Sequence, residues 1–177
     1  MYTEEPRPLE ELVPQRPYTS RSSHSFHGGS IINFTKDGAG IFLWHVLLFE
    51  EAFVPEAWLA EAAVPPGSTG QKIQIRLNWP GCKGLSESIN ILDHKGDPQP
   101  VSKFKLLRRV AVAIDKMMNT NTRLPGQNDG PWRIGPDGVR FYQIRLHSLR
   151  QVAKASWQPV LFWCGRPLEG VDDAPGV

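Results

Sequence analysis

The chain has little of what normally identifies a compartment or a chemistry. Its 177 residues include only two cysteines, Cys82 and Cys164, which cannot form a disulfide framework and agree with a reducing compartment. No apolar run approaches the roughly 18–20 residues that span a bilayer. The first 20 residues carry acids and prolines where a secretory signal needs a basic start and an apolar stretch. We therefore expect an intracellular protein, in the cytoplasm or nucleus, that does not contact a membrane.

Metal-binding patterns are also missing. His24 and His27 are three residues apart, and Cys82 and Cys164 could in principle complete a tetrahedral zinc site with them. However, neither cysteine belongs to a C-x-x-C pair, and structural zinc sites are normally built from two close pairs. We predict no metal and no cofactor.

Patterns for nucleophilic or acid–base catalysis are equally weak. Cys82 follows Pro80-Gly81 in a loop, but no strained turn or characteristic order links it to a histidine. The adjacent acids Glu50-Glu51 and Asp172-Asp173 diverge on any regular element, which favours a solvated surface. The histidines that could serve Cys82 as a base are His45, His94 and His147. We predict no catalytic residue, and leave open an enzyme whose polar groups converge from separate loops.

What the chain does have is a marked asymmetry of charge. Residues 1–69 carry nine acidic against four basic side chains, whereas residues 70–154 carry 15 basic against six acidic ones. The net charge of +2 therefore conceals a basic middle section. Such a section can contact nucleic acid or an acidic partner, or it can pack beside the acidic part so that the two fields cancel.

The clearest element lies in this basic section, from Ser102 to Met118. At 100° per residue, its apolar side chains fall in one arc of about 160°, which predicts an amphipathic helix. Pro100 and Ser102 supply the breaker and the cap that begin it. The residues of the apolar arc are Phe104, Leu106, Leu107, Val110, Ala111, Ile114, Met117 and Met118.

The opposite side of this helix is the candidate site. We call Lys105, Arg108, Arg109 and Lys116 the basic face, and Val112 lies among them. An apolar residue ringed by charge is typical of a protein contact, so we expect these five residues to bind another protein. Nucleic acid is the alternative partner, since a row of cations can neutralise phosphates. Further cations are predicted at exposed positions of neighbouring strands: Lys72, Arg76, Arg140 and Arg145.

The elements around the helix predict an α+β domain. Residues 72–79 alternate as a half-buried strand, and Ser88–Leu92 can return beside it. After the helix, Val139–Trp163 is predicted to hold a strand, an irregular or helical turn over Leu149–Ala155, and a final strand Val160–Trp163. This order of strand, strand, helix, strand, strand resembles the ubiquitin-type β-grasp, in which one helix covers a small mixed sheet.

The N-terminal part adds a hairpin and helix extension. Asp37-Gly38 and Asp137-Gly138 both lie between apolar runs and are predicted to form turns between strands. The run Ile41–Phe49 is apolar nearly throughout, and periodicity alone leaves open a central strand or a buried helix. Pro55–Ala63 is a short helix candidate. We predict a disordered arm over residues 1–28, one domain over 29–165 and a flexible tail over 166–177.

One family resemblance covers about half of the chain, from residue 72 to residue 163. It rests on Trp79-Pro80-Gly81, on Pro100-Val101-Ser102 before the helix, on Trp132-Arg133-Ile134-Gly135, on Leu146–Val152 and on Ser156-Trp157-Gln158-Pro159. This combination resembles a group of uncharacterised proteins from basidiomycete fungi. Members of that group often have an aromatic residue after the Trp-Pro-Gly triplet, where this chain has Cys82. The resemblance implies a fungal source and a shared small domain, and it implies no activity.

Overall fold

The structure is a computed structural model that describes residues 10–18, 29–48, 50–63, 70–93, 98–123 and 130–165. Over these residues the chain is an α+β protein with one eight-stranded mixed sheet, a two-stranded sheet and three α-helices. The α+β class is thus as predicted. Among the described residues, no helix combines the length and the apolar content needed to cross a membrane.

The longest strands are β9 (Ile144–Ala153) and β10 (Ser156–Cys164), which form an antiparallel hairpin. The predicted irregular turn over Leu149–Ala155 is wrong, because β9 continues to Ala153 and only Lys154-Ala155 turn. Two polar residues, Ser148 and Gln151, interrupt the strand pattern in the sequence although both are buried in the structure. The side chain of Gln151 is satisfied there: Oε1 accepts from Ser30 N at 3.3 Å and Nε2 donates to Lys154 O at 3.0 Å.

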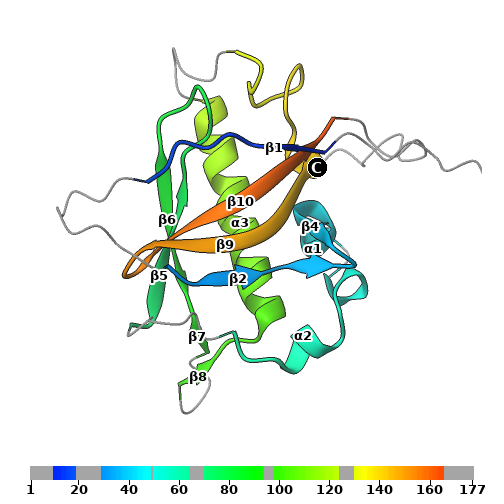
Figure 1. The fold of residues 1–177 in the computed structure, drawn as a ribbon, viewed down its shortest axis with the longest axis vertical. Helices are drawn as coiled ribbons and strands as arrows, with labels where there is room; N and C mark the ends of the chain where they lie inside the picture. The colour runs from blue at the N-terminus through cyan, green and yellow to red at the C-terminus, as the bar shows by residue number, and fades with distance from the viewer. Residues whose placement is uncertain are drawn as a thin grey trace, which may run out of the picture.

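The hairpin organises the rest of the sheet (Figure 1), whose order is β3-β4-β9-β10-β5-β6. β5 (Lys72–Leu77) runs parallel to the start of β10 and antiparallel to β6 (Leu85–Asn90). The predicted strand pair after residue 72 is therefore present, with its second strand beginning three residues earlier, at Leu85. β2 (Ile31–Asn33) lies beside β9.

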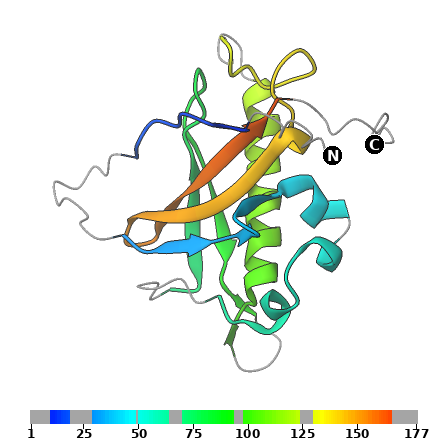
Figure 2. The ribbon, with the colours of Figure 1, turned by 45° about the vertical axis from the view of Figure 1, so that its right-hand side comes forward.

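α3 (Lys103–Thr122) covers one face of this sheet, and β9 and β10 cross it in both views (Figures 1 and 2). Every residue of the predicted apolar arc is buried, so the amphipathic interpretation is confirmed. Ser102 is the N-cap, and its side-chain oxygen accepts a hydrogen bond from the backbone N–H of Lys105 at 3.2 Å. The helix thus begins where the sequence predicts and continues for one more turn at its C-terminal end.

The N-terminal extension contains a hairpin followed by helical turns. Asp37 and Gly38 have φ angles of 54° and 81°, the positive values of a tight turn, and they join β3 (Thr35–Lys36) to β4 (Ala39–Phe42). The run from Ile41, for which the sequence left open a strand or a helix, contains both. β4 ends at Phe42, and α1 (Leu43–Leu48) follows directly. A 3₁₀ turn (Glu50–Phe53) and α2 (Ala57–Ala60) complete this part.

The second Asp-Gly turn is not a hairpin between strands. A single bridge joins Ile134 to Val139, and the chain enters a strand only at Ile144, after the 3₁₀ turn Phe141–Gln143. The turn is tight, since a Cβ at Gly138 would overlap the carbonyl oxygen of Arg133. Glycine is needed here for close approach of the backbone, and not for pairing two strands.

Part of the predicted arm belongs to the sheet. β1 (Glu10–Leu12) pairs antiparallel with the end of β10, and Val13 N donates to Leu161 O at 2.9 Å. The reason is that β10 extends past β5, so the second half of that edge is open to another strand. The rest of the predicted arm and the predicted tail lie outside the described residues.

Candidate protein-binding surface

The centre of the candidate site is Val112, in the middle of α3. It is 53% exposed, whereas Val110 and Ala111 before it and Ala113 and Ile114 after it are buried. The helical period causes this contrast, because Val112 is the one apolar residue of this stretch that points away from the sheet. Nothing in the described part of the chain buries this side chain. The predicted exposure is therefore present.

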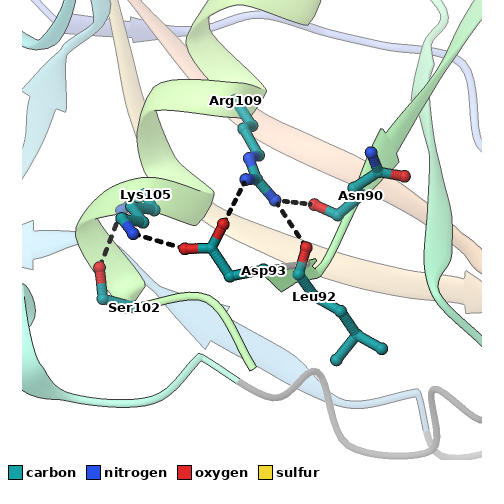
Figure 3. Close-up of polar contacts among 6 residues, drawn as sticks. All are labelled: Asn90, Leu92, Asp93, Ser102, Lys105 and Arg109. Atoms are coloured by element: carbon teal, nitrogen blue, oxygen red, sulfur yellow. Dashed lines mark hydrogen bonds and ion pairs between the residues drawn. The ribbon is translucent and has the colours of Figure 1, made fainter. Parts of the chain in front are cut away.

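Two residues of the basic face share one acid (Figure 3). Lys105 Nζ lies 2.5 Å from Asp93 Oδ2, and Arg109 Nη2 lies 3.9 Å from Asp93 Oδ1. Asp93 belongs to β7 (Leu92–Asp93), which pairs with β8 (Gln99–Pro100) just before the helix begins. The carboxylate is thus held beside the first turns of α3, and it neutralises part of the charge that the sequence places there.

Arg109 also binds the backbone at the end of β6. Its Nη1 donates to Asn90 O at 2.8 Å and is 3.5 Å from Leu92 O (Figure 3). A guanidinium can serve a carboxylate and two carbonyls together because it presents several N–H groups in one plane. Arg109 therefore fastens α3 to the segment between β6 and β7.

Lys116 makes the third contact of this kind. Its Nζ lies 2.6 Å from Glu87 Oε1, which projects from the middle of β6. The lysine side chain is 64% exposed, and ion pairs at such exposure contribute only about 0–1 kcal/mol to stability. The contact matters more for the shape and charge of the surface than for the fold.

Between these contacts lies a shallow groove of about 420 Å³, which we call the α3–β6 groove. One wall is β6 and the other is the exposed side of α3, which includes Val112. The residues that line it are Glu87, Ser88, Ile89, Asn90, Arg108, Arg109, Val112, Ala113 and Lys116. Its floor is therefore partly apolar and its rim is charged, which is the composition of many protein contacts.

The charge of this surface is smaller than the sequence suggests. The carboxylates of Glu87 and Asp93 lie against three of the four cations of the basic face, so they offset part of its charge. Arg108 lines the groove beside Val112 and is exposed. The four predicted site residues other than Lys105 all line one groove, and Lys105 lies one turn away.

The cations predicted on neighbouring strands do not extend the basic face. Arg76 alternates with the buried residues of β5, so it lies on the face of the sheet opposite α3, where its guanidinium is 4.5 Å from the Tyr18 ring. Arg145 forms an ion pair with Glu10 and lies over the Phe42 ring. Arg140 donates to Pro136 O in the loop before β9.

The cysteines and the described histidines do not assemble into a reactive centre. Cys82 lies in a separate groove of about 600 Å³ that contains no histidine among its described lining residues. His45 is stacked on Phe53, with ring centroids 4.3 Å apart. Burial, with a smaller contribution from Arg145, lowers the pKa of His45. Burial raises the pKa of the Cys164 thiol to about 11, which keeps it protonated and unreactive at neutral pH.

Within the described ranges, no three His, Cys, Asp or Glu side chains lie close enough together to hold a metal ion. His24 and His27, which were considered for a zinc site and set aside, and the candidate base His94 lie outside these ranges. The residues that sequence reasoning missed are Glu87 and Asp93, together with the β6 wall of the groove. No signal along the chain pairs them with α3, because the contacts depend on which strand lies beside the helix.

Comparison of the chain with protein-family models, with curated proteins and with solved structures finds no match.

Proposed function

We propose that this protein is a non-catalytic module that binds another protein through the α3–β6 groove and the basic face beside it. The single observation that carries the proposal is Val112, an aliphatic side chain that is 53% exposed and lines a groove together with charged residues. Burying such a side chain in a contact releases water from apolar surface, and the surrounding charges select the partner.

The pairing of the basic face favours a protein over nucleic acid as the partner. Phosphate binding depends on cations that can exchange small counterions for phosphates. Here Lys105, Arg109 and Lys116 already contact carboxylates, so each phosphate contact would have to displace one. Nucleic-acid binding stays the alternative, and an enzyme with a site built from loops stays the second.

A photo-crosslinking experiment tests the proposed surface. A photoreactive amino acid at position 112 should crosslink one partner in a lysate of the source cells, and mass spectrometry should find it at near-stoichiometric yield in a matched pull-down. Val112→Asp should remove the partner from the pull-down, because a carboxylate at the centre of the contact must be desolvated. Thr120→Asp is the matched control, since Thr120 is exposed on α3 but does not line the groove.

The same preparation separates the alternatives. A partner retained by Val112→Asp and lost with Thr120→Asp would place the contact elsewhere on the helix. A gel shift with nucleic acid that weakens steeply with salt, and that is lost in Arg108→Glu, would support the nucleic-acid alternative. Binding of nucleic acid that ignores salt would count against it.

We also propose that β5, β6, α3, β9 and β10 form a β-grasp-like unit. Its support is the order of the elements, together with β10 lying between β5 and β9 and running parallel to β5. Membership of the basidiomycete group and an intracellular location stay predictions from the sequence. Neither is needed for the binding experiment.

A further inference from the structure

β6 is the last strand at one end of the sheet (Figure 1), and its residues form one wall of the α3–β6 groove. Among the described residues it pairs only with β5, so its other long edge has no strand beside it. Exposed edges are normally blocked by proline, lysine or a bulge, because free N–H and C=O groups can pair with another chain. The strand reads Leu-Ser-Glu-Ser-Ile-Asn, which contains neither proline nor lysine, and its one charged side chain, Glu87, is paired with Lys116 of α3.

The hydrogen bonds of β5 show which backbone groups of β6 face outward. Gln74 N donates to Ala155 O, so Gln74 directs its backbone toward β10, and Ile73, Ile75 and Leu77 direct theirs toward β6. Their partners in the register are Ile89, Glu87 and Leu85. Because the direction alternates along a strand, the backbone groups of Ser86, Ser88 and Asn90 must point away from the sheet.

Two independent contacts agree with this assignment. Ile91 N donates to Gln71 O, so the backbone of Ile91 points to the β5 side, as the alternation along the strand requires. Asn90 O accepts from Arg109 Nη1, which lies beyond the outer edge. The carbonyl of Asn90 is therefore occupied, while the N–H and C=O of Ser86 and Ser88 form the open part of the edge.

We propose that the partner docks as an extended strand on this edge, so that its backbone pairs with Ser86 and Ser88 and its alternate side chains enter the α3–β6 groove. This inference rests on the proposed function and specifies how the contact is made. Strand addition of this kind derives affinity from backbone hydrogen bonds and specificity from pockets for alternate side chains. Nucleic acid has no equivalent of the peptide ladder, so the edge selects a polypeptide.

The residues that line the groove indicate which side chains a partner strand would carry on the side that faces α3. Side chains that point toward α3 lie opposite Glu87 and Ile89 and reach the region of Val112. The helix is aligned so that Lys116 is level with Glu87 and Arg109 with Asn90, which places Val112 near the level of Ser88. We therefore expect aliphatic residues against Val112, flanked by acids, since Arg108, Arg109 and Lys116 line the same groove.

A synthetic peptide provides the probe. Thr-Glu-Thr-Val-Thr-Val-Thr-Glu-Thr presents Glu, Val, Val and Glu on one side when extended and threonine on the other. Labelled with fluorescein, it should bind the full chain in an anisotropy titration. Replacing both Glu by Lys should weaken binding at least about tenfold, because three of the residues that line the groove, Arg108, Arg109 and Lys116, are cationic and one, Glu87, is acidic. Equal binding of the two peptides would overturn the predicted acidic character.

Backbone methylation tests the strand geometry without changing the protein. In an antiparallel alignment with β6, methyl groups on the threonine nitrogens should abolish binding, since these N–H groups then face β6 while the Glu and Val side chains face α3. Methyl groups on the valine nitrogens should leave binding within about threefold, because those N–H groups face solvent. Equal effects of the two patterns would overturn strand addition.

Variants of the protein separate this inference from the proposed function. Ser88→Pro removes an outward N–H that makes no bond to β5 and should weaken the peptide at least about tenfold, with Ser88→Thr as the matched control. Loss of binding in Val112→Asp but not in Ser88→Pro would leave the helix surface as the contact and overturn strand addition. A peptide that does not bind, while position 112 still crosslinks a partner, would do the same.

Discussion

A buried asparagine at the end of α3 offers the sharpest test of the packing. Asn121 is fully buried, and neither Nδ2 nor Oδ1 of its amide has a hydrogen-bond partner among the described residues. A buried polar group left unsatisfied costs about 1–3 kcal/mol. Leucine has the same number of side-chain heavy atoms, branched at the same carbon, and forms helices better by a few tenths of a kcal/mol, on the order of 0.4.

The free energy of unfolding of Asn121→Leu should therefore exceed that of the parent chain. Imperfect packing of a similar-sized side chain costs less than about 1.5 kcal/mol, so the net gain should be about 1–2 kcal/mol. Urea unfolding followed by tryptophan fluorescence should show a higher midpoint with an unchanged slope. The melting temperature should rise by roughly 2–4 °C per kcal/mol for a chain of this size.

Asn119→Leu is the matched control for that experiment. Asn119 is exposed on the same turn, so its replacement changes helix propensity but releases no buried amide. We expect a change within about 0.5 kcal/mol. Equal stabilisation by the two variants would attribute the gain to helix propensity alone. A loss of 1 kcal/mol or more in Asn121→Leu would refute the reasoning, because removing a satisfied amide leaves its buried partner without a hydrogen bond, at a cost of about 1–3 kcal/mol.

Three further predictions concern the core and the titrating groups. Leu107→Ala removes a fully buried side chain and should lower the free energy of unfolding by about 2–5 kcal/mol, whereas Val112→Ala should change it by less than about 0.5; comparable losses would contradict the assigned faces of α3. Because the pKa of His45 lies below its ordinary value of 6.5, its stabilising effect is present above pH 6.5 and is lost as the pH falls through the folded pKa. His45→Gln should flatten the decline in stability between neutral and mildly acidic pH, and an unchanged decline would exclude His45 as its source. The raised pKa of Cys164 predicts that iodoacetamide at pH 7.5 labels this thiol slowly in the native chain and rapidly in urea, as read by mass spectrometry; rapid native labelling would show that the thiol is accessible as thiolate.

The elements that sequence reasoning predicted well are those whose pattern is local. The helical period of apolar residues in α3 can be identified from its own sequence, and so can the alternation of apolar and polar residues in β5. Each element buries one side against a single layer of the fold. Asp37-Gly38 is equally local, since its positive φ angles demand these residue types. In each case the signal lies within one turn or one strand.

The elements that it missed depend on distant neighbours. The sequence predicts a strand and a turn in place of the continuous β9, because Ser148 and Gln151 interrupt the alternation of polar and apolar residues. The burial of these two side chains depends on partners such as Ser30, more than 100 positions away. The candidate site shows the same division. Val112 and the cations could be predicted from helical phase, but Glu87 and Asp93 could not, since only the register of the folded sheet brings them to α3.

The placement of β10 has a consequence for how the chain must acquire its structure during synthesis. The last strand of the described chain is also the central one, and it joins β9, β5 and β1. Its pairing with Glu10–Leu12 brings together two segments that lie far apart in the sequence, and such non-local pairing slows folding. A nascent chain that has emerged only as far as residue 155 would therefore hold α3 and the β5–β6 hairpin without the strand that unites them, and completion of the sheet must await the emergence of β10.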